Sequence, residues 1–220
     1  MRALSMILRA AGALGIAAAV LAQWRRTQEN EAAGTGETSF VSLNFFSFFT
    51  IESNVFAALV LGIGFFMMMR RGPEPKGFTL LRAIAVTYMA TTGIVYNLLL
   101  RGIELPQGAT VAWSNEVLHL AGPLLVVLDW LIAPGKRRLE PGMLWPIVAF
   151  PVIWAGYTLI RGALVLDPRT GSHWYPYPFL NPAASANGYF SVAFYVLLIA
   201  VMIWAVGALV LRTSRRLRIG

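Results

Sequence analysis

Apolar residues follow one another in long runs along this chain instead of alternating with polar ones, and short polar stretches separate the runs. Six of the runs reach the roughly 20 residues that a helix needs to cross a bilayer. They cover positions 3–22, 41–69, 77–100, 113–133, 144–165 and 188–212. The pattern predicts an all-α integral membrane protein, in which residues 1–220 form a single transmembrane bundle of six helices.

The first run has two interpretations. Arg2 and Arg9 precede the apolar stretch 10–22, and the small residues 17–19 resemble a cleavage site, so the segment also fits a secretory signal peptide. As a membrane span it carries Arg9 close to its start, and we expect that side chain to extend toward the lipid headgroups. The sequence leaves both interpretations open.

Charge adds an orientation to the six spans. The chain is 57% hydrophobic and 13% charged, whereas soluble domains have about 25% charged residues. The net charge of +8 does not indicate nucleic-acid binding, because the basic residues lie at the ends of apolar runs and form no aromatic-basic stripe. Eleven of them fall on the side that holds both chain ends, against four on the other. Since basic loops face the cytoplasm and its anionic lipids, we expect both termini to be cytoplasmic in a cell membrane.

Polar residues inside the runs are the candidates for function, because they are costly in a bilayer. In the second run, Ser47, Thr50 and Asn54 fall three and four positions apart and share a helix face. In the fourth run, Asn115 and His119 are four apart and also share a face. Pro123 follows His119 by four residues, so it cannot donate to the His119 carbonyl and should kink the helix.

Depth separates these residues into two levels. With a rise of about 1.5 Å per residue, Thr50 lies about 14 Å and His119 about 9 Å below the outer boundary. Asn97 ends the third span, and Tyr157 and Arg161 end the fifth, so they fall in the same outer half. The polar residues within the spans of the inner half are mainly Arg82 and Asp129, which we expect to pair.

The residue types restrict the chemistry. The chain has no cysteine, and His119 is its only histidine within a span, which excludes thiol chemistry and disfavours haem and zinc sites. No phosphate-binding loop, dinucleotide fingerprint or serine-hydrolase elbow is present. We therefore predict neither a cofactor nor a metal. A threonine hydroxyl and an imidazole at similar depth remain, and they are a nucleophile and its base if they touch.

Three motifs resemble a known family. The segment 48–54 resembles the threonine-bearing segment of the androgen-induced gene hydrolases, which include the androgen-dependent TFPI-regulating protein. Asn115-x-x-x-His119-x-x-x-Pro123 resembles the family's Asn-His-x-x-His-x-x-x-Pro pattern, with Glu116 in place of the first histidine. Residues 177–180 resemble its Tyr-Pro-Phe-Leu motif.

The resemblance implies a membrane hydrolase that cleaves fatty acid esters of hydroxy fatty acids, with Thr50 as nucleophile and His119 as its partner. The depths add that a lipid ester could enter this site sideways from the outer leaflet. Further candidates around the substrate are Asn97, Asn115 or Tyr157 as donors to an oxyanion, Arg161 for a substrate carboxylate, and Asn54 on the face of Thr50.

Other interpretations remain for the same residues. A membrane threonine commonly bonds to its own helix backbone, and a histidine can serve an interhelical hydrogen bond. Glu52 is expected to pair with Arg101 or Arg161. The alternatives to a hydrolase are a protein that binds or transports a small amphiphile and a structural partner with no chemistry.

Overall fold

A computed structural model describes residues 2–34, 38–70, 72–103, 109–167 and 170–216, which are mainly helical and contain no β-strand. The principal helices are α1 (Arg2–Gly34), α2 (Thr38–Phe46), α3 (Phe49–Met69), α4 (Lys76–Val95), α5 (Ala112–Glu116), α6 (Gly122–Ile132), α7 (Leu144–Leu164) and α8 (Tyr189–Arg216). Two π-helical turns, η1 (Tyr96–Leu100) and η2 (Val117–Ala121), extend α4 and join α5 to α6. Three short 3₁₀ turns are η3 (Pro141–Met143), η4 (Pro178–Leu180) and η5 (Pro182–Ala184).

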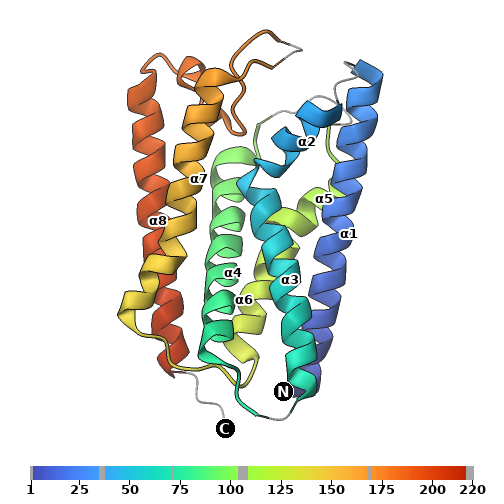
Figure 1. Ribbon diagram of the computed structural model, residues 1–220, viewed down its shortest axis with the longest axis vertical. Coiled ribbons are helices and arrows are strands. Elements are labelled where there is room, and N and C mark those ends of the chain that lie inside the picture. Colours follow the sequence, from blue (N-terminus) through green and yellow to red (C-terminus); the bar gives the residue numbers. More distant parts are fainter. Residues whose placement is uncertain (1, 35–37, 71, 104–108, 168–169, 217–220) are drawn as a thin grey trace.

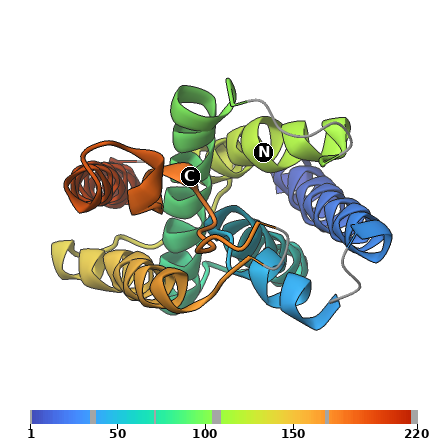
Figure 2. The ribbon, with the colours of Figure 1, turned by 90° about the horizontal axis from the view of Figure 1, so that it is seen from above.

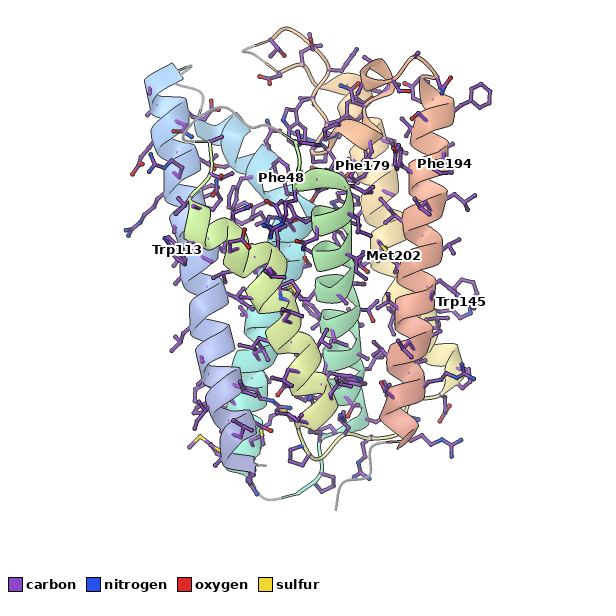
Figure 3. The ribbon with its side chains drawn as sticks, turned by 180° about the vertical axis from the view of Figure 1, so that it is seen from behind. Phe48, Trp113, Trp145, Phe179, Phe194 and Met202 are labelled. Carbon is purple, nitrogen blue, oxygen red and sulfur yellow. The ribbon has the colours of Figure 1, made fainter. Side chains whose placement is uncertain are left out.

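Within the described residues, six helices are long and apolar enough to cross a membrane, in agreement with the predicted all-helical bundle of six apolar helices. Their bounds are Arg2–Gly34, Phe49–Met69, Lys76–Leu100, Ala112–Ile132, Pro141–Leu164 and Tyr189–Ser214. The outward faces of α7 and α8 are apolar and exposed, as Trp145 and Phe194 illustrate (Figure 3). Such faces suit contact with lipid.

The helices are arranged around α4. Helix α4 packs against α3, α6 and α8, while α1 packs against α3 and α6 (Figure 2). Helices α7 and α8 form a pair on the other side of α4. The start of α1 and the end of α8 lie at one end of the bundle, and the 166–187 connection lies at the other (Figure 1). We call the half that carries this connection the loop half.

Four buried charges join the helices in the half opposite the loop half. Arg9 donates to Asp129 at 2.8 Å and to Glu74 at 3.1 Å. Arg82 donates to Asp129 at 2.7 Å and to both carboxylate oxygens of Glu74 at 2.9 Å. All four side chains are buried. Two cations facing two anions leave no net charge in the apolar interior, which is the condition for burying them.

The expected Arg82–Asp129 pair is therefore confirmed, but the expectation for Arg9 is wrong. Its side chain is completely buried and does not extend toward the headgroups. Its Nη1 also donates to the Gly64 carbonyl at 2.9 Å, and a Cβ on Gly64 would lie 2.8 Å from that same nitrogen. The missing side chain of Gly64 makes room for the guanidinium, so α1 is an integral element of this bundle.

Replacement of Arg9 by Met should destabilise the protein by about 3–5 kcal/mol, because it leaves two buried carboxylates facing one cation. Thermal unfolding of the purified protein in detergent measures the effect. Arg26→Met is the control: Arg26 is also on α1, but its side chain is 44% exposed and lies 3.8 Å from Glu29. Adding Asp129→Asn to Arg9→Met should recover part of the loss by restoring charge balance. Equal melting temperatures for Arg9→Met and Arg26→Met would contradict the prediction.

Candidate functional site

A cavity of about 320 Å³ lies in the loop half between α3, α4, α7 and α8. Its wall is mostly apolar, and the Tyr177–Leu180 end of the long connection closes it toward the loops. Figure 3 shows Phe179, one of its lining residues, near the loop ends of α4 and α8. The lining residues Val152 (64% exposed), Gly156 and Ala200 are exposed on α7 and α8. The cavity therefore reaches the apolar outer surface of the bundle between these two helices.

Thr50 lies on the wall of this cavity and contacts Tyr177. The Tyr177 hydroxyl accepts a hydrogen bond from the Thr50 backbone N–H at 3.2 Å, and it is also 3.2 Å from Thr50 Oγ1. Both residues line the cavity. Burial raises the pKa of Tyr177, and the charge of Glu52 adds to this effect. Tyr177 therefore remains a neutral phenol near pH 7, able to donate a hydrogen bond and unable to act as the base for Thr50.

A break in the second predicted span makes this contact possible. The segment predicted as 41–69 is divided into α2 and α3 by Ser47 and Phe48, which are not helical. Thr50 is consequently the second residue of α3, where backbone N–H groups have no partner within the helix. The Tyr177 hydroxyl supplies one. Thr50 and Asn54 still share one face of α3, whereas Ser47 lies outside that helix.

No hydrogen bond joins His119 to Thr50 in the described part of the chain. Among the described residues, the hydrogen bond of the imidazole is between Nδ1 and the Asn115 carbonyl at 2.9 Å. Its ring stacks on Tyr96 with centroids 3.8 Å apart. Tyr96 lines the cavity and His119 does not, so the tyrosine ring covers one face of the imidazole at the cavity wall.

The helix irregularity around His119 explains the role of Asn97. Pro123 has no N–H to offer the His119 carbonyl, and the chain adopts the π-helical turn η2 here, in which Gly122 donates to Val117. Asn97 Nδ2 donates to the His119 carbonyl at 3.1 Å and to the Gly93 carbonyl at 2.8 Å. The kink expected from Pro123 is thus a wider helical turn whose freed carbonyl has a side-chain donor.

Asn54 and Asn115 also donate hydrogen bonds to neighbouring groups of the protein. Asn54 Nδ2 donates to the Thr50 carbonyl at 2.8 Å and the Leu118 carbonyl at 3.1 Å, which connects the helix of Thr50 to the turn of His119. Asn115 donates to the Tyr96 hydroxyl. None of Asn54, Asn97 and Asn115 lines the cavity.

Tyr157 and Arg161 lie on α7 at the junction between α2 and α3. The Tyr157 hydroxyl is 3.0 Å from Ser47 Oγ, and Arg161 donates to Asn44 at 2.7 Å. The Arg161 guanidinium also lies 4.8 Å from the centre of the Trp174 ring. Neither Tyr157 nor Arg161 lines the cavity, so the geometry does not direct Arg161 toward a carboxylate bound there.

The expected pairing of Glu52 is not present in the described part of the chain. Arg101 instead binds Glu116 through two hydrogen bonds of 2.8 and 2.9 Å, so the residue that replaces a histidine of the family pattern is an ion-pair partner. One carboxylate oxygen of Glu52 is buried without a hydrogen-bond partner. Within the described residues, no group of three or more acidic, histidine or cysteine side chains could hold a metal ion.

Tyr177 is a functional candidate that the polar residues within the apolar runs did not indicate, because it lies in the connection between two runs. Its signal was present, because it begins the Tyr-Pro-Phe-Leu motif. The motif carries no indication of which span it contacts, since it lies 127 positions from Thr50. Comparisons with known proteins add no assignment: no protein-family model, no curated protein and no solved structure matches this chain.

Replacement of Asn97 by Leu should cost about 1–3 kcal/mol of stability, because it leaves the partly buried His119 carbonyl without a donor. The cost should be smaller when Pro123 is Ala, since residue 123 then offers an N–H to the same carbonyl. Thermal unfolding of the two single variants and the double variant forms the cycle that measures this coupling. Independent, additive effects would mean that Asn97 does not compensate for Pro123.

Proposed function

We propose that this protein binds a long-chain amphiphile in the loop-half cavity and hydrolyses its ester bond, with Thr50 as the nucleophile. The observation that carries the proposal is the location of Thr50, which lies in the wall of an apolar cavity that reaches the exposed apolar surface of the bundle. An apolar substrate loses little on leaving the bilayer for such a cavity. Water, the second reactant, would have to pass the Tyr177–Leu180 segment that closes the cavity toward the loops.

The proposed reaction has two steps. Thr50 Oγ1 attacks the ester carbonyl carbon, its proton goes to a base, and the carbon–oxygen bond to the alcohol breaks as the base returns the proton to the leaving oxygen. Water then attacks the acyl-threonine, which releases the acid and restores the hydroxyl. The neutral Tyr177 phenol, 3.2 Å from Thr50 Oγ1, is suited to donate a hydrogen bond to the oxygen that becomes negative.

His119 is our candidate for the base, and Tyr96 must then move. The imidazole lies against the face of Tyr96, whose other surroundings include the cavity. Rotation of the Tyr96 ring would open a direct path between the imidazole and the cavity. The hydrogen bond from Asn115 to the Tyr96 hydroxyl is the contact that this rotation must break.

A second candidate is an amphiphile-binding protein without chemistry. It is favoured by one observation, which is that His119 makes no hydrogen bond with Thr50. In this case Thr50 and Tyr177 would bind the polar group of the ligand and leave its bonds intact.

Orientation is also part of the proposal. The excess of basic residues at the end that holds the termini supports a cytoplasmic location for that end. The loop half, with Thr50 and the cavity, would then lie in the outer leaflet of a cell membrane.

Replacement of Thr50 by Ala should reduce hydrolysis of a long-chain ester by the purified protein roughly 1,000-fold or more, because the attacking oxygen is removed. It should also abolish labelling by a serine/threonine-directed fluorophosphonate. Ser53→Ala is the matched control, since Ser53 is a buried hydroxyl on the same helix that does not line the cavity. Unchanged turnover in Thr50→Ala would refute the nucleophile, and ligand binding by a wild-type protein that shows no turnover would select the second candidate.

Single cysteines test the orientation, because the chain contains none. Ala186→Cys lies in the connection of the loop half, and Gly142→Cys lies in the exposed connection before α7. A membrane-impermeant maleimide should label Ala186→Cys in intact cells and Gly142→Cys only after permeabilisation. The reverse result would place the loop half in the cytoplasm.

A further inference from the structure

The cavity wall contains no charged side chain among the described residues. Its hydroxyls belong to Thr50, Thr91, Thr92, Tyr96 and Tyr177. Two cations of the loop half have partners elsewhere, since Arg101 binds Glu116 and Arg161 binds Asn44. An ionised carboxylate or phosphate placed in the cavity would lose its hydration and gain no opposite charge, which is strongly unfavourable.

Thr91 differs from the other hydroxyl-bearing residues of the cavity wall in its hydrogen bonding. The residue is 2% exposed, and its hydroxyl oxygen is buried without a hydrogen-bond partner among the described residues. Thr87, one turn earlier on α4, donates to the Ala83 carbonyl at 2.8 Å, which is the usual arrangement for a threonine in a helix. Thr91 lines the cavity, but its hydroxyl oxygen is not accessible from the cavity, so an occupant can satisfy this polar group once the side chain rotates toward it.

The remaining hydroxyls on the wall all have partners. Thr92 Oγ1 is 3.0 Å from Ser53 Oγ, and Thr50 Oγ1 is 3.2 Å from the Tyr177 hydroxyl. The Tyr96 hydroxyl accepts from Asn115. Thr91 is therefore the hydroxyl of the described wall that an occupant can engage without displacing a hydrogen bond of the protein.

We infer that the cavity takes a single-chain amphiphile whose polar group is uncharged, and that Thr91 donates a hydrogen bond to this group. The inference rests on the proposed function and narrows its substrate to neutral esters, to the exclusion of free acids and phosphate-bearing lipids. The volume of about 320 Å³ lies at the lower end of the range for ligand sites, which fits one chain better than two.

The heights of Thr50 and Thr91 are compatible with one ester group. Ser53 lies beside Thr92, and Thr50 is one turn of α3 closer to the loops, so Thr50 and Thr91 differ by about 6 Å along the bundle axis. Each hydrogen bond extends about 3 Å from its donor. The difference in height along the axis therefore allows one ester group to lie between the levels of Thr50 and Thr91.

The replacement of Thr91 by Val keeps the shape of the side chain and removes its hydroxyl. In the empty protein no hydrogen bond is lost, so the melting temperature should stay the same or rise. With an uncharged ligand one hydrogen bond is lost, so the affinity should fall roughly threefold to tenfold. A merely structural threonine gives a different pattern, in which stability falls and affinity does not.

The test measures equilibrium binding of radiolabelled 2-heptadecanone and palmitate to the purified full-length protein in detergent, at a pH where the acid is ionised. The ketone has an uncharged carbonyl and cannot be hydrolysed, so binding is separated from turnover. We expect the ketone to bind at least tenfold more tightly than palmitate, and Thr91→Val to weaken the ketone alone. Thr87→Val, which changes a buried hydroxyl that does not line the cavity, should leave both affinities unchanged.

Three outcomes would overturn the inference: palmitate binding as tightly as the ketone, no binding of the ketone, or equal effects of Thr91→Val and Thr87→Val on ketone affinity. Failure of this inference can be distinguished from failure of the proposed hydrolase. Tight ketone binding without ester turnover refutes the nucleophile and retains the ligand class. Ester turnover with a preference for palmitate retains the hydrolase and refutes the ligand class.

Discussion

Charge neutralisation within an apolar interior is the constraint on which this bundle depends. Arg9 and Arg82 face Glu74 and Asp129 with all four side chains buried, so each carboxylate has two cationic neighbours. The four side chains come from α1, α4, α6 and the turn before α4, so the cluster joins all four segments. Removing a single member leaves a buried charge without its partner. This costs far more stability than replacing the whole cluster by apolar side chains. All four charges of this cluster are consequently paired.

The loop half is built differently, from interruptions of regular helix. The break before α3 and the π-helical turn η2 each release backbone groups, and in an apolar interior those groups require partners. Tyr177 accepts from the Thr50 N–H, Asn97 donates to the His119 carbonyl, and Asn54 donates to the Leu118 carbonyl. The polar residues that accumulate here therefore serve first to satisfy an irregular backbone. The cavity lies beside this irregular region, where α7 and α8 pack on α4.

Depth in the membrane and direction around the helix axis carry different information about a site. Thr50 and His119 belong to the same level, and Asn54 connects their two segments. Their side chains nevertheless have different surroundings, since Thr50 faces the cavity and His119 stacks behind Tyr96. A nucleophile and its base must agree both in depth and in the direction in which their side chains point. A shared depth alone therefore does not establish that they form a pair. In the proposed hydrolase, the Tyr96 ring has to move before His119 can face the cavity.

The sequence by itself determined the six apolar helices, the inner pairing of Arg82 with Asp129 and the accumulation of polar residues near one level. These features follow from local composition and from a fixed rise per residue, which need no knowledge of neighbours. Tertiary structure decided that Arg9 is a buried ion-pair member, that a tyrosine 127 positions away contacts Thr50, and that Thr91 lacks a partner. Each of these depends on which helix faces which. Hydrophobicity places a helix in the membrane but leaves its rotation and its neighbours to side-chain packing, and the identity of a partner follows only from that packing.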